Sequence, residues 1–116
     1  CDLIEIRHMK EACEKEAFLL HVFTEEERRQ AGGNFSMLAG TFAVKEAVSK
    51  VFGTGFRTFL PQDVEVLRDE LGKPYVRLYG NAKVLAGKKG IRRLEVSISN
   101  TAEHAMAFAV GEGEAI

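Results

Sequence analysis

The stretch FAVKEAVSKVFGTG, residues 42–55, predicts the second half of a long helix that ends in a glycine turn. Asn34 is a favourable N-terminal cap, and apolar residues recur at helical spacing after it, so we expect a helix over about 35–52. Gly53 suits the left-handed backbone conformation that closes many helices. The rest of the fold is therefore expected to be organised around this helix.

Strand patterns follow the helix and also precede it. VEVLRDELGKPYVRLY (64–79) alternates valine and leucine with polar residues around a turn at 69–72, which predicts a β-hairpin. LEVSISN (94–100) and HAMAFAVGE (104–112) predict a second hairpin, and CDLIEI (1–6) predicts a short strand. Because no strand–helix–strand unit repeats, we predict an α+β fold in which an antiparallel sheet packs against the long helix.

The remaining segments have helical patterns. RHMKEACEKEAFLLHVF (7–23) has apolar residues three and four positions apart, which predicts one continuous helix. TEEE (24–27) is a capping box that opens another helix, and the glycine pair at 32–33 ends it. Asn81 is the predicted cap of a short helix with the sequence AKVLAG.

The composition is that of one globular domain, which we expect to span 1–116. The formal net charge of −1 argues against general binding to nucleic acid. No apolar run approaches the roughly 20 residues needed to cross a bilayer, so no membrane partner is expected. Two cysteines are too few for a disulfide framework, and we expect a reduced, cytoplasmic protein. The chain begins at Cys1 without an initiator methionine, so we expect further residues upstream.

Two carboxylates and a lysine are the strongest candidates for chemistry. Asp2 and Glu46 suit Mg²⁺, which binds one or two protein carboxylates together with substrate phosphates. Lys50 lies one helical turn after Glu46, and Lys45 and the turn at 53–55 add further donors for phosphate oxygens. The alternative is an exposed aspartate and a surface ion pair that contributes about 0.3–0.5 kcal/mol. The helix dipole disfavours an anion at this C-terminal turn, so spacing alone leaves both interpretations open.

Five segments together resemble the holo-acyl-carrier-protein synthases, the small bacterial class of 4′-phosphopantetheinyl transferases. They are DLIEI from Asp2, FTEEE from Phe23, MLAGTFAVKEAVSKVFGTG from Met37, DVEVLRDELGKPYVRL from Asp63 and VSISNTAEHAMAFAV from Val96. The segments cover nearly the whole chain, and the first and third are highly specific when they occur together.

The resemblance implies a magnesium-dependent transfer of 4′-phosphopantetheine from coenzyme A to a serine of apo acyl carrier protein, a step of fatty acid biosynthesis that releases adenosine 3′,5′-bisphosphate. Asp2 and Glu46 match the metal ligands, and Lys50 matches a lysine near the pyrophosphate. These three are the predicted catalytic residues, and either Glu46 or a metal-bound water takes the serine proton. The predicted coenzyme contacts are Lys45, Lys50, Gly53, Thr54, Gly55, Lys73 and Pro74.

The resemblance also implies an assembly and a partner surface. Members of the family are typically homotrimers with each active site at a subunit boundary. The helix that begins near Arg7 matches the surface that docks the acidic carrier protein. Lys73 and Pro74, taken without the resemblance, suit the exit of a turn.

The chain departs from the family pattern at three positions. Thr41 and His8 stand where the family usually has arginine, which removes one cationic contact to the coenzyme and changes the docking helix. Asn100 stands where the family has histidine, and an amide cannot act as an acid or base. Two alternatives therefore remain, namely a coenzyme A or nucleotide sensor without turnover and a purely structural domain.

Overall fold

The structure is a computed structural model, and it describes residues 1–113. Its elements are β1 (Asp2–Glu5), α1 (Ile6–Cys13), α2 (Glu16–Val22), α3 (Glu25–Ala31), α4 (Phe35–Phe52), the 3₁₀ turn η1 (Pro61–Asp63), β2 (Val64–Arg68), β3 (Pro74–Leu78), α5 (Gly80–Lys88), β4 (Ile91–Asn100) and β5 (His104–Gly113). The predicted long helix and both predicted hairpins are present. None of the helices of residues 1–113 is long and apolar enough to cross a bilayer.

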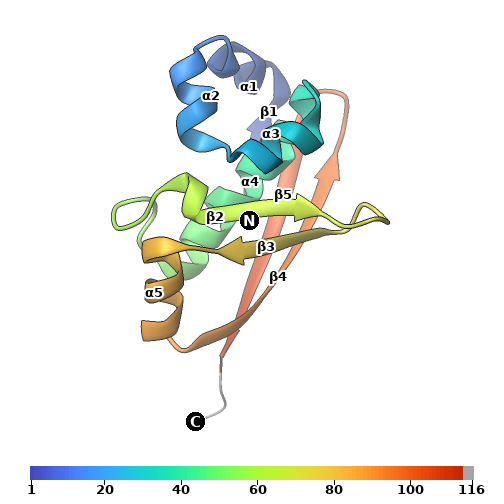
Figure 1. Cartoon of the computed structure of the whole chain (residues 1–116). Coiled ribbons are helices and arrows are strands. Elements are labelled where there is room, and N and C mark those ends of the chain that lie inside the picture. The colour runs from blue at the N-terminus through green and yellow to red at the C-terminus, as the bar shows by residue number, and fades with distance from the viewer. Residues whose placement is uncertain (114–116) are drawn as a thin grey trace.

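The long helix α4 lies at the centre of the molecule (Figure 1). The strands β1, β5 and β4 form one antiparallel sheet in that order, and β2 and β3 form a separate two-stranded sheet. Helix α4 contacts strands of both sheets, and 11 of its 18 residues are buried. A helix buried on most sides is expected where partners cover more than one face. The α+β fold is confirmed, with two sheets against the helix where one was expected.

The ends of α4 follow from local chemistry. The side chain of Asn34 accepts a hydrogen bond from the amide of Met37 at 3.1 Å, which caps the N-terminus of the helix as predicted. Gly53 has a φ of 79° and closes the C-terminus in the left-handed conformation. The helix therefore begins and ends where the sequence pattern indicated.

The N-terminal helical segment differs from the prediction of one continuous helix. It divides into α1 and α2, because Lys15 has an extended backbone with φ −87° and ψ 111°. The break turns α2 back over the core, where the ring of Phe18 lies 6.3 Å from that of Phe23 and 6.2 Å from that of Phe42. A straight helix could not bury both Met9 of α1 and Val22 of α2 in the same cluster, so burial overrides the local helical pattern.

The prediction that Asn81 caps the short helix α5 is wrong. Helix α5 begins at Gly80, two residues before the predicted first helical residue Ala82, and Tyr79 precedes it without a side-chain cap. The backbone amide of Tyr79 donates to the carbonyl of Asp63 at 2.8 Å, which holds the chain against η1. A Cβ at position 80 would lie 3.1 Å from the carboxylate of Asp63, so this contact requires the glycine.

Candidate active site

The structure brings Asp2, Glu46 and Lys50 together where β1 meets α4. The ammonium of Lys50 lies 2.8 Å from Oδ1 of Asp2 and donates at 3.0 Å to the backbone carbonyl of Cys1. Glu46 lies one turn before Lys50 on the same helix, and the negative charge of Asp2 raises the pKa of its carboxylate. The two predicted metal ligands, far apart in the sequence, thus share one site.

The electrostatics of this site favour an additional cation. Burial raises the pKa of Glu46 above its ordinary value, the charge of Asp2 raises it further, and Lys50 partly offsets both effects. The hydrogen bond and the charge of Asp2 in turn raise the pKa of the Lys50 ammonium. Two carboxylates that repel each other despite a neighbouring lysine are a donor set that fits Mg²⁺. No cluster of three or more metal-ligating side chains occurs among residues 1–113, which leaves further positions on such an ion to phosphate or water.

The glycine turn after α4 is open. Gly53 and Gly55 have φ values of 79° and 62°, and no atom of the described chain apart from their immediate neighbours in sequence would lie within 4 Å of a Cβ added at either position. The hydroxyl of Thr54 donates to the carbonyl of Gly55 at 2.9 Å, which holds the turn in shape. The turn therefore offers uncrowded backbone close after Lys50, about two helical turns beyond Glu46.

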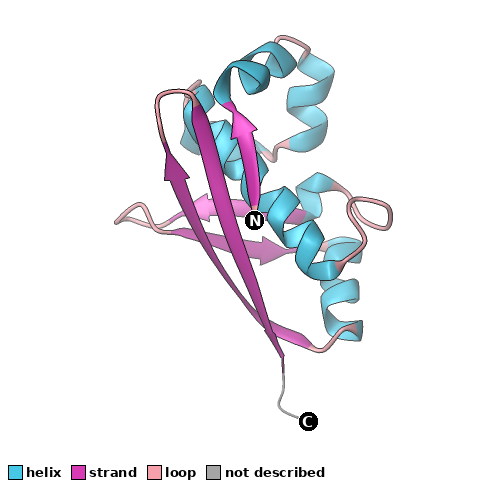
Figure 2. Cartoon of the chain, turned by 180° about the vertical axis from the view of Figure 1, so that it is seen from behind, coloured by secondary structure: helices cyan, strands magenta, loops and turns pink. Residues whose placement is uncertain are grey.

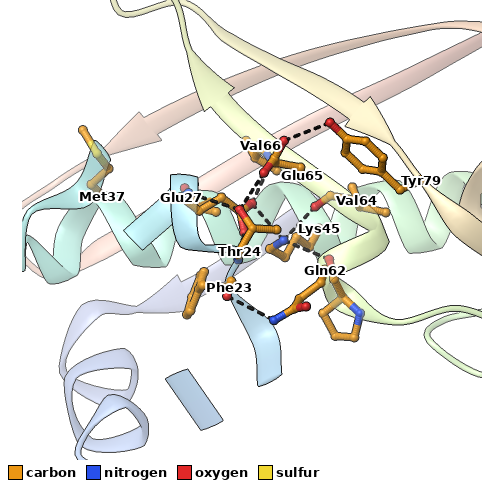
Figure 3. Close-up of polar contacts among 12 residues, drawn as sticks. Phe23, Thr24, Glu27, Met37, Lys45, Gln62, Val64, Glu65, Val66 and Tyr79 are labelled. Atoms are coloured by element: carbon orange, nitrogen blue, oxygen red, sulfur yellow. Dashed lines mark hydrogen bonds and ion pairs between the residues drawn. The ribbon is translucent and has the colours of Figure 1, made fainter. Parts of the chain in front are cut away.

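Lys45 does not reach this site, which corrects its assignment as a coenzyme contact. Its side chain is 0% exposed and forms an ion pair at 2.8 Å with Glu27, whose side chain is also 0% exposed (Figure 3). The same ammonium donates to the carbonyl of Pro61 at 2.9 Å and to that of Val64 at 2.7 Å. These partners account for all three donors of the lysine and leave it no access to a ligand.

The ion pair belongs to a buried network that sequence reasoning did not find. Glu27 also accepts hydrogen bonds from the backbone amides of Thr24 at 2.8 Å and Val66 at 2.7 Å. The same carboxylate therefore completes the capping box of α3 and binds a backbone amide of β2. Glu65 accepts from the hydroxyl of Thr24 at 2.7 Å and from that of Tyr79 at 3.3 Å (Figure 3). The network ties α3, α4 and β2 together and fixes the helix that carries Glu46.

Lys73 and Pro74 lie on another part of the molecule. Lys73 is the last residue of the turn between β2 and β3, and Pro74 is the first residue of β3. This turn projects to one side of the chain, while the C-terminal end of α4 lies toward the other (Figure 2). Lys73 is exposed and lies 3.7 Å from the carboxylate of Glu95. Within one chain these two residues are therefore separate from Asp2, Glu46 and Lys50.

The three positions that depart from the family pattern have defined surroundings. Thr41 is 2% exposed, and its hydroxyl accepts a hydrogen bond from the guanidinium of Arg68. The amide nitrogen of Asn100 donates to the hydroxyl of Ser36 at 3.0 Å and to its carbonyl at 3.2 Å, which joins β4 to the start of α4. His8 is exposed and lies 3.1 Å from the carboxylate of Glu5.

The fold and the site together define a class of protein: a small α+β domain whose central helix carries a carboxylate and a lysine beside a second carboxylate, suited to a metal-bound phosphate. Residues 1–109 match the 4′-phosphopantetheinyl transferase superfamily. A holo-[acyl-carrier-protein] synthase of Lachnoclostridium phytofermentans is 50% identical over 111 residues, which cover 96% of this chain and 91% of that protein. The chain belongs to this superfamily, and the predicted resemblance to the holo-acyl-carrier-protein synthases is confirmed.

Solved structures of such synthases have the same fold. The crystal structure of Helicobacter pylori holo-[acyl-carrier-protein] synthase in complex with coenzyme A has a TM-score of 0.85 at 27% identity and covers 96% of each chain. The synthase of Bacillus anthracis in complex with CoA (3′,5′-ADP) has a TM-score of 0.79 at 31% identity and covers 97% of this chain and 93% of that one. The expectation of an enzyme of this family, as opposed to a structural domain, is confirmed.

Proposed function

We propose that the protein transfers 4′-phosphopantetheine from coenzyme A to a serine of apo acyl carrier protein with the help of Mg²⁺. The convergence of Asp2 and Glu46 beside Lys50 carries the proposal, because paired carboxylates and a lysine are the groups that a magnesium diphosphate requires. We take the identity of the acceptor, acyl carrier protein, from the names of the relatives. We take the identity of the donor, coenzyme A, from two structural neighbours that were solved in complex with it.

In the proposed reaction the serine oxygen attacks the β-phosphorus of the coenzyme, and the bond to the departing adenosine 3′,5′-bisphosphate breaks. Asp2 and Glu46 would hold a magnesium ion, which when bound neutralises charge on the phosphates. Lys50 exchanges its ion pair with Asp2 for contact with a phosphate oxygen, so that its charge stabilises the transition state. The serine proton must pass to a base at the site, and either Glu46 or a water molecule held there would accept it.

The proposed assembly is a homotrimer with active sites at the subunit boundaries. Four large apolar side chains are exposed on the face of the β1–β5–β4 sheet that points away from α4: Leu3 (63% exposed), Met106 (47%), Phe108 (55%) and Val110 (48%). Such a patch is typical of an interface. An assembly through this face also gives Lys73 and Pro74 a role, since the turn of one subunit can reach the carboxylates of the next.

The proposed docking surface for the carrier protein is α1. Arg7 and Lys10 are exposed on this helix, although Arg7 lies 3.9 Å from Glu11. Exposed cations attract an acidic partner and raise its association rate more than they raise affinity. His8, which is exposed beside Arg7, adds charge to this surface only when it is protonated. A cytoplasmic location and a part in fatty acid biosynthesis complete the proposal.

The test is mass spectrometry of apo acyl carrier protein after incubation with the protein, coenzyme A and Mg²⁺. We expect a mass increase equal to one phosphopantetheine group, lost with Asp2→Asn, with Glu46→Gln and with a chelator. Lys83→Gln, a change at an exposed lysine of α5, is the matched control and should leave the transfer intact. Calorimetric binding of coenzyme A without any modified carrier protein would instead favour the sensor, which Thr41 and Asn100 motivate.

A further inference from the structure

The loop between α4 and η1, residues 54–60, follows Gly53 directly and contains the second and third residues of the open glycine turn. It extends to one side of the molecule (Figure 1). Its first end is fixed, because the amide of Gly53 donates to the carbonyls of Ser49 and Lys50 at 3.0 and 3.1 Å. Since loops are more mobile than the elements they connect, the shape of the turn also depends on how the other end of the loop is held.

Lys45 holds that other end. Its ammonium donates to the carbonyl of Pro61 at 2.9 Å and to that of Val64 at 2.7 Å (Figure 3). Pro61 is the first residue of η1, and Val64 is the first residue of β2. We call these two hydrogen bonds the Lys45 clamp. Because Lys45 lies on α4 about two turns before Gly53, the helix from which the loop departs also binds the place to which it returns.

Aromatic rings pack between the loop and the helix. The ring of Phe59, which is 4% exposed, lies 5.5 Å from that of Phe52 at the end of α4 and 5.4 Å from that of Phe56. Such apolar contacts favour burial without fixing a direction, whereas hydrogen bonds set both the distance and the angle of the groups they join. The rings therefore close the loop against α4, and the Lys45 clamp defines where the returning chain lies.

Stability alone does not account for a lysine at this position. Burial lowers the pKa of Lys45, although the charge and the hydrogen bond of Glu27 act in the opposite direction. Replacement of a buried ion pair by apolar side chains of similar volume is often neutral or stabilising. An apolar side chain at position 45 could not, however, bind the carbonyls of Pro61 and Val64. The lysine is thus distinguished by what it orients.

We propose that Lys45 positions the glycine turn at 53–55 for coenzyme A, because the Lys45 clamp fixes the far end of loop 54–60. The inference rests on the proposed function, in which this turn contacts the coenzyme beside Lys50. Lys45 is then a positioning residue that touches neither coenzyme nor carrier protein. Loss of the clamp weakens the binding of coenzyme A and leaves the affinity for the carrier protein, which is proposed to dock on α1, unchanged.

The test compares two variants that both lack the buried ion pair. Glu27→Gln removes the carboxylate charge, and the amine of Lys45 keeps a donor for each of its two carbonyls even when it is neutral. Glu27→Gln combined with Lys45→Met removes the donors as well and leaves no buried charge. We expect Kd and KM for coenzyme A to be about 10-fold higher in the double variant than in Glu27→Gln, and KM for the carrier protein to differ by a factor of about two at most. Calorimetry with coenzyme A and Mg²⁺ measures Kd, and the transfer assay measures both KM values.

Val44→Ala is the control for lost stability. Val44 is the fully buried neighbour of Lys45 on α4, and its truncation removes packing without touching the clamp. A purely structural effect lowers the amount of folded enzyme, and therefore the apparent kcat, and leaves both KM values unchanged. Val44→Ala should show that result, whereas the double variant should show the selective rise in KM for coenzyme A.

A longer loop tests the same inference with the buried network intact. Two glycines inserted between the exposed residues Arg57 and Thr58 would separate the clamp from the turn, and surface loops tolerate such insertions. We expect this variant to fold and to bind coenzyme A about 10-fold more weakly than the unchanged protein. An insertion without effect on coenzyme affinity, or equal affinities in Glu27→Gln and the double variant, would overturn the inference and leave the proposed function standing. Absence of transfer in the unchanged protein would refute the proposed function itself.

Discussion

The ammonium of Lys50 in α4 lies 2.8 Å from the carboxylate of Asp2 in β1, and the two residues are 48 positions apart in the sequence. The pair joins the strand to the helix at the point where a cation is needed between two carboxylates. Without a ligand, Lys50 partly neutralises Asp2 and Glu46. A divalent cation must therefore compete with the lysine for Asp2, while a phosphate would draw the lysine away.

This competition predicts opposite effects of Lys50→Met on metal binding and on catalysis. Removal of the ammonium should strengthen Mg²⁺ binding severalfold in the absence of coenzyme, because Asp2 loses its competing partner. It should lower kcat about 100-fold or more, because the transition state loses a stabilising charge. Calorimetry measures the first effect and the transfer assay the second, with Lys83→Met as control. Weaker Mg²⁺ binding in the variant would show that Lys50 organises the carboxylates and does not compete for them.

Glu46→Gln should stabilise the metal-free protein at neutral pH while it abolishes transfer. The folded state raises the pKa of Glu46 above its ordinary 4.5, so the charged carboxylate opposes folding, and this penalty is present above the raised pKa and absent below 4.5. The variant should melt at a higher temperature than the unchanged protein at pH 7, and the difference should vanish as the pH falls through 4.5. Thermal unfolding in the presence of a chelator measures it.

Addition of Mg²⁺ and coenzyme A should reverse that order. Ligands that bind only the folded state raise its stability, and Glu46→Gln removes one of the proposed metal ligands. The unchanged protein should therefore gain melting temperature with ligand, and the variant should gain little. If the variant were less stable than the unchanged protein at pH 7 without metal, burial and the charge of Asp2 would not be destabilising the carboxylate of Glu46, and this interpretation would be wrong.

Local signals were sufficient to predict most of the fold. The cap at Asn34 and the glycine at 53 fix both ends of α4 within a few residues, and the alternation of 64–79 specifies its hairpin register through the turn. The break between α1 and α2 was not predictable in this way, because the 7–23 pattern is helical throughout. Tertiary packing decides it, as the burial of both halves requires a bend.

The site was predictable only in part, for a related reason. Glu46 and Lys50 are neighbours on one helix, so their spacing places them on one face, but Lys45 has the same local signals and points into the core. Its partner Glu27 is 18 positions away and was assigned only to a capping box. The hydrogen bond from Arg68 to Thr41 likewise joins two elements and carries no local signal. Burial and long-range contacts are what a single sequence does not specify.

The buried pair predicts a strong coupling between Glu27 and Lys45. Lys45→Met leaves a buried carboxylate without its cation and should cost about 3–5 kcal/mol of unfolding free energy. The double variant with Glu27→Gln removes that charge, so we expect it to be less destabilised than the sum of the single variants. Urea unfolding at one fixed protein concentration measures the cycle, because assembly adds to apparent stability. Additive effects would mean that the pair contributes only through its separate hydrogen bonds.

The proposed trimer predicts the effect of a charge on the exposed sheet face. The distribution of apolar side chains along β5 is the reverse of what an isolated subunit would favour. The small residues Ala105 and Ala107 are buried against α4, whereas the large residue Phe108 is 55% exposed. Small residues inside and large apolar residues outside are expected when a second copy covers the outer face.

Phe108→Asp should therefore convert a trimer to monomers and, since each site is proposed to span two subunits, reduce transfer about 100-fold or more. Light scattering after size-exclusion chromatography measures the mass, with Val84→Asp on the exposed face of α5 as the control. A trimer that survives Phe108→Asp, or full activity in a monomeric variant, would contradict an active site shared through this face.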